Sequence, residues 1–351
     1  MNNNFKDHFY ETPILITGHI NPDGDAIGSA LALKLLLTSM NIEATVSFDI
    51  TGDLPSNLDH LPYKLITTPS EKRYKTVFVF DCGNSSRLGS LEPLVLNSEK
   101  VVVVDHHIDP TFGDLQMIDP NAASTTQVLY RIFKDEELEI SKEIADCLMT
   151  GLITDTGRFQ YSNTDAEVFT IAADLMSLGA NLSLISEKIY GSIELNALKL
   201  QSAVIDRLEL DQDLRFIYSI VYQDDYKKFN TTSSETDSLI DVVRLAKESN
   251  IALLLKEQND GTFKGSLRSR TDFNVQQLAS FFDGGGHKAA SGFSSNLSID
   301  EIIKNVNSVE TGNYAIVNLK KISEPLLKNF EYRHQKSIKK AINSKVEIIV
   351  S

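Results

Sequence analysis

The sequence predicts an α/β fold that begins with a doubly wound, mainly parallel sheet and continues with a smaller mixed α/β domain. Three apolar runs, at residues 14–17, 77–80 and 101–104, are each four residues long and rich in β-branched side chains. Such short, continuous runs are typical of strands buried on both faces of a parallel sheet. Helical stretches follow them, and alternation of strands with helices is the pattern of a doubly wound domain.

Apolar periodicity and capping residues indicate the helices of this first part. They are expected at residues 26–40, 124–133 and 141–153. Asp25 is placed to cap the first of them. Thr164 and Glu167 form a capping box ahead of a further helix, which Gly179 ends. The doubly wound domain is therefore expected to extend to about residue 185.

The remainder of the chain has a different pattern of elements. A helix is expected at residues 194–210, strands at 216–222, 251–257 and 262–270, and a last helix at 299–309. Asn259, Asp260 and Gly261 form a hairpin turn before the third of these strands. We predict a catalytic domain at residues 1–190, a helical connector at 191–212, a smaller domain across a cleft at 213–312, and a basic extension at 313–351.

Length and charge limit the classes of function. A chain of 351 residues is too long for one ordinary core, which favours two domains. The formal net charge of −14 disfavours long nucleic acid as a stable partner, because an acidic protein gains little from counterion release. Charge is uneven, since residues 313–351 hold eight Lys or Arg against three Glu. A small anionic substrate, held by metals and a few basic residues, fits this balance.

The sequence is that of a cytoplasmic protein without a membrane partner. Its apolar runs stay well below the ~18–20 residues of a membrane-spanning helix. The N-terminal residues lack the basic and apolar segments of a secretory signal. Cys82 and Cys147 are the only cysteines and form no CxxC pair, which fits a reducing compartment.

Each of the three predicted strands of the first domain leads into a motif of carboxylates and imidazoles. The motifs hold His19, Asp23 and Asp25, then Asp81, then Asp105, His106 and His107, and Asp155 follows in TDTGRF. The carboxyl ends of parallel strands meet at one edge of a sheet, where ligands bind. We therefore expect these side chains to lie close together.

Taken singly, each motif also fits a turn, a helix cap or a surface pair. Their combination favours a metal site, because clustered carboxylates are costly to bury without positive charge. Mixed carboxylate and imidazole ligands suit Mn²⁺, with Mg²⁺ or Fe²⁺ as alternatives. Two such ions at about 3.5–4 Å activate a water and clamp both oxygens of a phosphoryl displacement.

The second domain offers groups for substrate binding. Arg268 and Arg270 alternate with Ser269 on a predicted strand, and an arginine fork suits a phosphate or a stacked base. The alternative to substrate binding is that both arginines lie on a solvent-exposed face of the strand. The glycines before His287 allow the backbone to approach a phosphate. The candidate substrate-binding residues are Arg158, Arg268, Arg270, Gly284, Gly285, Gly286 and His287.

These motifs closely resemble those of the DHH phosphoesterase family. HINPDGDAIGS, DCGN, VDHH and TDTGRF occur in the family's order, and SLRSR and GGGHKAASGF resemble the DHH-associated C-terminal domain of its nanoRNase and pAp-phosphatase branch. The resemblance covers about residues 10–310. It implies a pair of Mn²⁺ ions at the junction of two lobes. The glycine run is often four long in the family and is three long here.

The resemblance also implies roles for individual residues. It assigns His19, Asp23 and Asp81 to one metal and Asp25, His106 and Asp155 to the other, with Asp81 as the bridge. It places His107 against the phosphate, where the ring stabilises negative charge. Asp105 then orients a histidine from behind. Asp81, Asp105 and His107 are thus the implied catalytic residues.

The implied activity is hydrolysis of short oligoribonucleotides and of 3′-phosphoadenosine 5′-phosphate (pAp). Cyclic dinucleotides or their linear products are an alternative substrate class. A non-catalytic nucleotide sensor is disfavoured, because every expected metal ligand is present. The pyrophosphatase and RecJ relatives fit less well, since the former carry a lysine-rich C-terminal signature that is absent here and the latter are longer. The oligomeric state is open, and a homodimer is compatible with the sequence.

Overall fold

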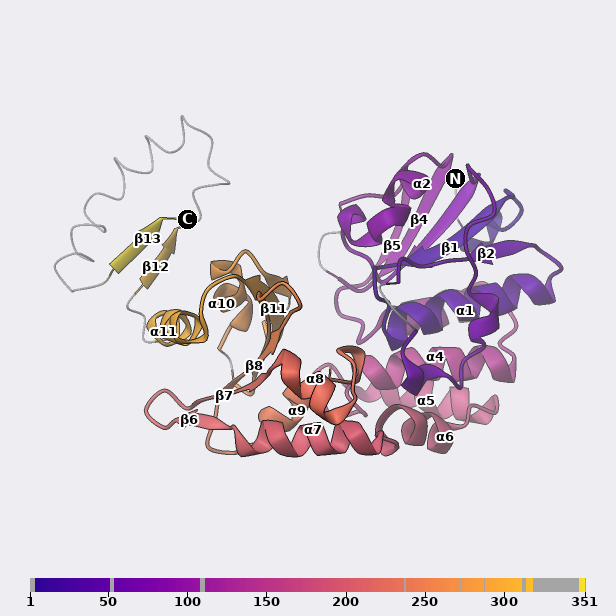
Figure 1. Cartoon of the computed structure of the whole chain (residues 1–351). Helices are drawn as coiled ribbons and strands as arrows, with labels where there is room; N and C mark the ends of the chain where they lie inside the picture. The colour runs from indigo at the N-terminus through magenta and orange to yellow at the C-terminus, as the bar shows by residue number, and fades with distance from the viewer. Residues whose placement is uncertain are drawn as a thin grey trace. The chain divides into compact units, whose positions relative to one another are not determined.

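The computed structural model describes residues 4–50, 54–107, 111–236, 238–271, 273–286, 288–310, 314–317 and 347–350. The chain divides into two compact units, Met1–Ser192 and Ile193–Ser351 (Figure 1). Each unit has its own sheet and its own cores.

A five-stranded parallel sheet forms the centre of the first unit. Its strands are β1 (Ile14–Gly18), β2 (Ala44–Val46), β3 (Thr76–Phe80), β4 (Lys100–Asp105) and β5 (Leu115–Ile118). They run in the order β2-β1-β3-β4-β5, so the three predicted strands occupy the middle of the sheet. Ile16 pairs with Phe78, which pairs with Val102, and this register aligns the ends of β1, β3 and β4.

Alternate side chains of the central strands enter two different cores, as expected of a doubly wound domain. Ile16, Phe78 and Val102 pack beneath the larger helical layer, whereas Leu15, Val77 and Val103 pack on the opposite face. In Figure 1 the helices α1, α4 and α5 lie on one side of the sheet and α2 on the other. The helices of this unit are α1 (Gly24–Ser39), α2 (Glu92–Leu96), α3 (Thr125–Asp135), α4 (Lys142–Asp155), α5 (Ala166–Ser177) and α6 (Leu182–Ser186). Short 3-10 helices at η1 (Phe5–His8), η2 (Ser56–Leu58), η3 (Tyr63–Leu65) and η4 (Ser85–Leu91) and a π-helical turn at η5 (Glu187–Gly191) complete it.

Two predicted helix caps are wrong by one or two residues. The side chain of Asp23, rather than Asp25, accepts hydrogen bonds from two backbone amides at the start of α1. Asp25 lies inside the first turn and is buried. Asp165, rather than Thr164, caps α5 by accepting from the amide of Val168 at 2.9 Å. In both cases two neighbouring polar residues are good caps, and the backbone path decides between them.

Glycines allow α1 and α4 to cross closely. A Cβ on Gly28 would lie 2.5 Å from the carbonyl oxygen of Cys147, and a Cβ on Gly24 would meet the side chain of Thr154. The close crossing brings the first turn of α1 beside the last turn of α4. These turns carry Asp25 and Asp155.

The second unit contains a mixed six-stranded sheet of order β10-β11-β9-β8-β7-β6. Its strands are β6 (Glu209–Asp211), β7 (Phe216–Val221), β8 (Ile251–Glu257), β9 (Phe263–Ser269), β10 (Gly285–Gly286) and β11 (Ala290–Ser295). Strands β7 and β8 pair in parallel, and the other pairs are antiparallel. Helices α7 (Leu195–Asp206), α8 (Gln223–Phe229), α9 (Leu239–Val243), α10 (Val275–Phe281) and α11 (Ile299–Glu310) and the turn η6 (Ser234–Thr236) accompany it.

The predicted connector is part of the second unit. Leu200 and Val204 of α7 pack with Ile217 of β7 and Leu254 of β8 in one of its two cores. Sequence periodicity shows a helix but not what that helix packs against. Beyond α11, β12 (Tyr314–Val317) pairs in parallel with β13 (Glu347–Val350), and the rest of the predicted basic extension lies outside the described residues.

In the described part of the chain, no single helix has both the length and the apolar character to cross a membrane. Helix α5 and the segment Leu182–Gly191 meet those criteria only as a pair, with a bend of 117° between them.

The α1–α4 crossing makes a prediction for stability. Gly28→Ala should lower the free energy of unfolding by about 1–3 kcal/mol, because the new methyl group meets a backbone oxygen that cannot move aside. Gly285→Ala is the matched control, since a Cβ there has nothing within 4 Å, and it should change stability by less than about 0.5 kcal/mol. Urea unfolding followed by circular dichroism measures both. Equal stability of the two variants would contradict the packing described.

Candidate metal centre

The candidate site lies at the carboxyl edge of the parallel sheet. The loop after β1 supplies His19 and Asp23, and Asp81 directly follows β3. Asp105 ends β4, with His106 and His107 immediately after it. Helices add Asp25 from the first turn of α1 and Asp155 from the last residue of α4. The structure thus brings all eight predicted residues to one place.

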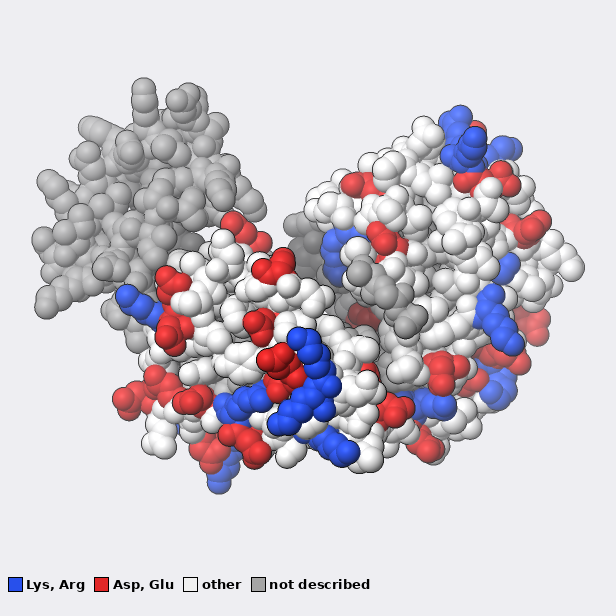
Figure 2. Space-filling model, viewed as in Figure 1, with Lys and Arg blue, Asp and Glu red and all other residues white. Residues whose placement is uncertain are grey.

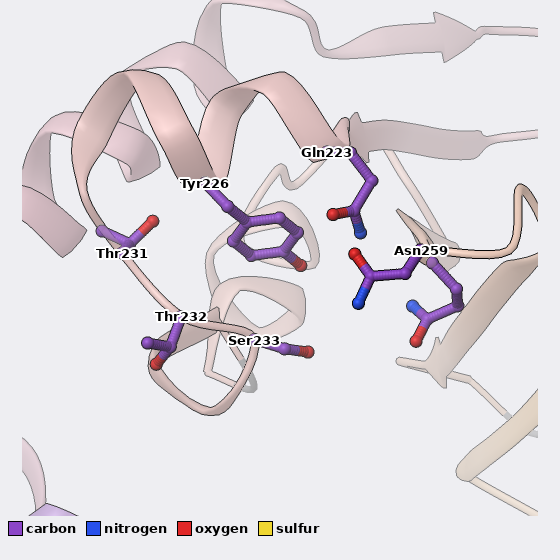
Figure 3. Close-up of a pocket in the computed structure, with 7 residues that line it drawn as sticks. Gln223, Tyr226, Thr231, Thr232, Ser233 and Asn259 are labelled. Carbon is purple, nitrogen blue, oxygen red and sulfur yellow. The ribbon is translucent and has the colours of Figure 1, made fainter. Parts of the chain in front are cut away.

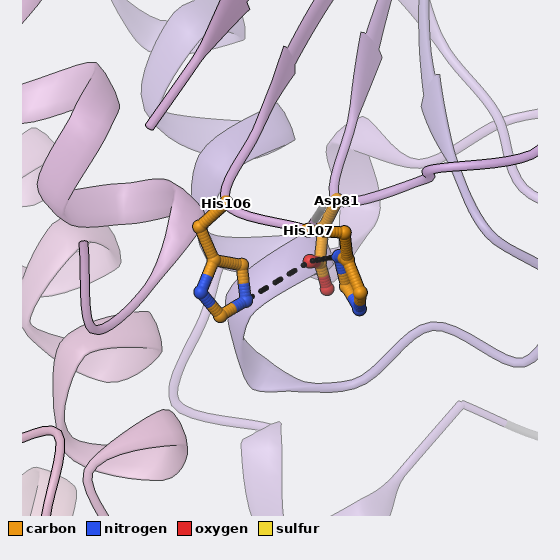
Figure 4. Close-up of side chains that lie close together, drawn as sticks. All are labelled: Asp81, His106 and His107. Carbon is orange, nitrogen blue, oxygen red and sulfur yellow. Dashed lines mark ion pairs between the residues drawn. The ribbon is translucent and has the colours of Figure 1, made fainter. Parts of the chain in front are cut away.

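Three overlapping groups of these side chains have the spacing of metal ligands. Within each group one ligand atom per residue lies within 4.8 Å of the others. The groups are His19 with Asp23 and Asp81, Asp81 with His106 and His107, and Asp25 with His106 and Asp155. Figure 4 shows the second group, in which both imidazole rings face the carboxylate of Asp81.

The carboxylate of Asp81 lies between the groups. Its Oδ2 is 3.5 Å from Nε2 of His19, whereas its Oδ1 is 3.6 Å from Nε2 of His106 and 3.4 Å from Nδ1 of His107. The two oxygens therefore face different sets of donors. Asp81 has a positive φ of 53°, a conformation that Asp tolerates better than most residues and that is found at functional sites.

Backbone carbonyls fix the orientation of two histidines. Nδ1 of His19 is 2.9 Å from the carbonyl oxygen of Ile20, and Nδ1 of His106 is 3.2 Å from that of Ala122. A carbonyl oxygen can only accept, so each Nδ1 carries the proton. In the neutral ring the lone pair is then on Nε2, the atom that faces the carboxylates and can bind a metal.

Asp105 holds His107 from behind. Its Oδ1 accepts a hydrogen bond from Nδ1 of His107 at 2.7 Å and also accepts from the backbone amides of His106 and His107. The side chain of Asp105 is fully buried, and its Oδ2 has no hydrogen-bond partner in the described structure. Asp105 thereby fixes the orientation of the His107 ring.

The start of α3 holds Asp25, a role that the sequence analysis missed. The backbone amides of Thr125 and Thr126 donate to the two oxygens of Asp25 at 2.6 and 2.9 Å. These are orphan amides of a helix N-terminus, which favours negative charge. Gly151 makes room, since a Cβ there would lie 2.5 Å from Oδ1 of Asp25.

A hydroxyl group from the same turn reaches the bridging carboxylate. Oγ1 of Thr125 donates to Oδ1 of Asp81 at 3.2 Å. Ser124, at which the sequence predicts this helix to begin, is the N-cap of α3 and accepts from the amide of Gln127. The sequence thus predicts a helix that starts at residue 124, but only the fold shows that this helix start lies beside Asp25.

The negative charge of the carboxylates in the site is not balanced by basic side chains of the described residues. In the described residues the ion pairs of these carboxylates involve histidines, with no lysine or arginine among them. Burial lowers the pKa of His19, but hydrogen bonds and charges from Asp23 and Asp81 outweigh it and raise that pKa to about 10. The pKa of His106 likewise rises to about 10, because the hydrogen bond that its ring donates to Asp155 and nearby carboxylate charges exceed the effect of burial.

Two of the carboxylates are also shifted toward their protonated forms. Burial and then the charge of Asp81 raise the pKa of Asp25 to about 7. Burial and the charge of Asp25 raise the pKa of Asp155 well above its ordinary value. Without metal, the site therefore retains protons to balance its charge. Carboxylates and imidazoles that need positive charge, and whose ligand atoms converge, fit divalent cations.

The arginines predicted for the second unit have contrasting positions. Arg268 lies on β9, paired with Ala252 of β8 and Ala290 of β11. Strand β9 ends at Ser269, and Arg270 follows it. The guanidinium of Arg270 donates to three backbone carbonyls after α9, the shortest at 2.9 Å to Ala246. These bonds give Arg270 a structural role.

The glycine run serves packing at two positions and leaves one open. A Cβ on Gly284 would lie 2.3 Å from the carbonyl oxygen of Gly292, and one on Gly286 would lie 2.6 Å from that of Ala290. A Cβ on Gly285 would have nothing within 4 Å. Gly285 is thus the residue of the run with free space beside it. His287, predicted to bind substrate, lies outside the described residues.

Arg158 follows α4 in the first unit. It has a positive φ of 63° and is exposed. Its guanidinium stacks 4.2 Å from the ring centroid of Tyr190, a cation–π contact.

Comparison with protein families identifies both halves of the chain. Residues 13–152 match the N-terminal domain of the DHH family, and residues 213–311 match the DHHA1 domain. The first match spans the sheet and all the metal-ligand candidates except Asp155. The second spans strands β7 to β11 of the mixed sheet, with Arg268 and the glycine run.

Named relatives and a solved structure resemble most of the chain. An NrnA protein of Streptococcus mutans is 32% identical over 82% of this chain and 90% of its own length. The bifunctional oligoribonuclease and PAP phosphatase NrnA of Thermus thermophilus is 30% identical, covering 80% of this chain and 84% of its own. An exopolyphosphatase-related protein from Bacteroides fragilis has a TM-score of 0.81 at 25% identity, covering 88% and 94%. With these matches and the convergent carboxylates and histidines, the chain belongs to the DHH family of phosphoesterases.

Proposed function

We propose that this chain is a Mn²⁺-dependent, two-metal hydrolase that cleaves short oligoribonucleotides and removes a phosphate from pAp. The observation that carries the proposal is the carboxylate of Asp81, whose two oxygens face two different groups of ligand atoms. The substrates are those that the names of the NrnA relatives print. We place the protein in the cytoplasm, which its two buried free thiols support.

The donor groups divide into two sets around Asp81. We assign His19, Asp23 and Asp81 to one ion and Asp25, His106 and Asp155 to the other, with Asp81 shared. When bound, two divalent ions supply an activated water and neutralise charge on the phosphate oxygens. Mn²⁺ suits this set of carboxylates and imidazoles, and Mg²⁺ is the nearest alternative.

His107 is the residue that we expect to contact the scissile phosphate. Burial lowers its pKa, but the hydrogen bond that Nδ1 donates to Asp105 and the charges of Asp81 and Asp105 outweigh that and raise it. A protonated ring with Nδ1 held by Asp105 presents Nε2–H as a donor in a fixed direction. It can therefore stabilise negative charge that develops on a phosphate oxygen.

The DHHA1 domain is proposed to hold the remainder of the substrate. Arg268 offers a guanidinium for a phosphate or a stacked base, and Gly285 offers a backbone with open space beside it. His287 is the third candidate. Arg158 and Arg270 are further candidates, whose guanidinium groups contact the ring of Tyr190 and the backbone carbonyl of Ala246.

The first prediction of this proposal concerns the bridging carboxylate. Asp81→Asn should bind fewer than two Mn²⁺ per chain and lose at least about 100-fold in activity on pAp and on dinucleotides alike. Asp174→Asn is the matched control, because Asp174 pairs with Lys134 on the surface of the same unit. Metal content after desalting and initial rates measure the effect. Two ions per chain with full activity in Asp81→Asn would refute the two-metal arrangement.

The second prediction concerns protons. At pH 7 His19 and His106, with pKa values of about 10, are protonated without metal, yet a ligand nitrogen must be neutral. Binding of Mn²⁺ should therefore release about two protons, with a further fraction from Asp25. The association constant of each ion should increase about 10-fold per pH unit between pH 6 and 8, and the product of the two constants about 100-fold. Calorimetry in buffers of different ionisation enthalpy measures the release. An affinity independent of pH would show that these imidazoles are not ligands.

The third prediction concerns substrate length. Figure 2 shows both acidic and basic side chains among uncharged ones on one described face, and the net charge is −14. Efficiency should therefore be highest for about two to five nucleotides and fall for strands of ~20, with a salt slope of roughly −1.5 to −2 for two or three contacted phosphates. Rates and binding across a length series test this. Efficient cleavage of a ~24-mer with a slope near −4 would indicate an extended basic channel instead.

A further inference from the structure

A second polar site lies in the DHHA1 domain, formed by the start of α8, the loop after it and the tip of the β8–β9 hairpin. Its volume is about 220 Å³, less than the ~300 Å³ at which pockets for drug-sized ligands begin. The lining residues are Gln223, Tyr226, Thr231, Thr232, Ser233, Gln258 and Asn259 (Figure 3). We call this the amide pocket. Its size suits a single heterocycle.

The amide pocket is separate from the substrate residues proposed above. Strands β8 and β9 form a ladder from Ile251 and Ser269 at one end to Glu257 and Phe263 at the other. Arg268 pairs with Ala252 near the first end, whereas Gln258 lies just beyond the second. At ~3.3 Å per residue, the six residues from Ala252 to Gln258 span roughly 20 Å along the strand.

Every side chain that lines the amide pocket is polar and uncharged. A phosphate group is therefore a poor ligand, because it needs basic groups or a cluster of free amides. Thr231 is buried, and its hydroxyl has no hydrogen-bond partner in the described structure. A buried polar atom without a partner is costly, and a ligand can satisfy it.

Two glutamines in the pocket have a fixed orientation. The side-chain nitrogen of Gln223 donates to the carbonyl of Glu257 at 2.5 Å, and that of Gln258 donates to the carbonyl of Lys256 at 2.9 Å. Because a carbonyl oxygen cannot donate, neither amide can be flipped without losing its bond. Each glutamine therefore offers its Oε1 as an acceptor, and a matching ligand must present N–H donors.

An aromatic ring and a further amide complete the recognition surface. In Figure 3 the ring of Tyr226 lies beside the amides of Gln223 and Asn259, and the three groups face a common space. Bases stack on aromatic side chains and pair their edges with Asn and Gln amides. The side chain of Asn259 is exposed and can supply either a donor or an acceptor.

We propose that the amide pocket binds a nucleobase that carries an exocyclic amino group, such as adenine, in a nucleoside or nucleotide. The amino group donates to the glutamine acceptors, and the ring lies against Tyr226. Phosphates of the ligand, where present, remain in solvent. This site goes beyond the proposed hydrolysis, since binding requires neither metal nor turnover.

Adenosine and inosine test the proposal, because adenosine has an amino donor at C6 and an acceptor at N1, whereas inosine has a carbonyl acceptor at C6 and a donor at N1. The protein is the full chain with Asp81→Asn, without added metal, and binding is measured by calorimetry or ligand-observed NMR. Adenosine should bind at least about 10-fold more tightly than inosine, the size of one to two neutral hydrogen bonds. Tyr226→Leu and Asn259→Ala should each weaken the binding of adenosine by about 5- to 10-fold. Melting temperatures show whether both variants are folded.

Arg268→Ala in the same background is the control for position. Adenosine bound in the amide pocket should keep its affinity within about 2-fold in this variant, because Arg268 lies at the other end of the β8–β9 ladder, whereas binding that depends on Arg268 reports the substrate residues. Equal affinity for adenosine and inosine, or no binding of either, would overturn the proposal. Loss of binding in Arg268→Ala, with full binding in the pocket variants, would place the nucleoside at the substrate residues instead. None of these outcomes depends on hydrolysis, so failure here leaves the proposed function unaffected.

Discussion

The structure depends on one electrostatic constraint, the need for positive charge among carboxylates gathered at one edge of a sheet. Asp25 and Asp81 are buried, and Asp155 is half-buried. In the described chain, the ion pairs of Asp81 and Asp155 involve only histidines. Without metal, protons on histidines and on two of the carboxylates meet the need, which explains why their pKa values rise. Divalent ions meet the same need at neutral pH and bring the chemistry that cleaves phosphate esters. The same side chains therefore hold protons when metal is absent and must release them to bind metal.

Much of the surrounding fold serves to hold these charges in place. The glycines of α1 and α4 allow the two helices to approach, and Gly151 leaves room for the carboxylate of Asp25. The first amides of α3 bind that carboxylate, and the hydroxyl of Thr125 binds Asp81. Backbone carbonyls and Asp105 set which ring nitrogen of each histidine faces the centre. Ligands fixed in this way bind metal with little reorganisation, because their entropy has already been lost on folding.

The sequence was sufficient for the three middle strands of the sheet and for the convergence of the motifs that follow them, because both follow from local rules. Buried strands have continuous apolar runs, and motifs at their carboxyl ends must converge in a parallel sheet. It was insufficient where the answer depended on packing between distant segments. Asp23 and Asp25 were equally good caps by composition, and only the backbone path shows that Asp23 caps α1. The contact of Thr125 with Asp81, 44 residues away, has no local signature. The same holds for α7, a visible helix whose packing partner was not predictable.

The central claim is that Asp81 bridges two metal ions, and anomalous diffraction from crystals grown with Mn²⁺ tests it most directly. Data collected on both sides of the manganese absorption edge locate each ion without reference to activity. The account predicts two peaks about 3.5–4 Å apart, one beside each oxygen of Asp81. One peak should lie against His19 and Asp23, and the other against His106 and Asp155. A single peak under saturating Mn²⁺, or two peaks with no shared contact to Asp81, would contradict it.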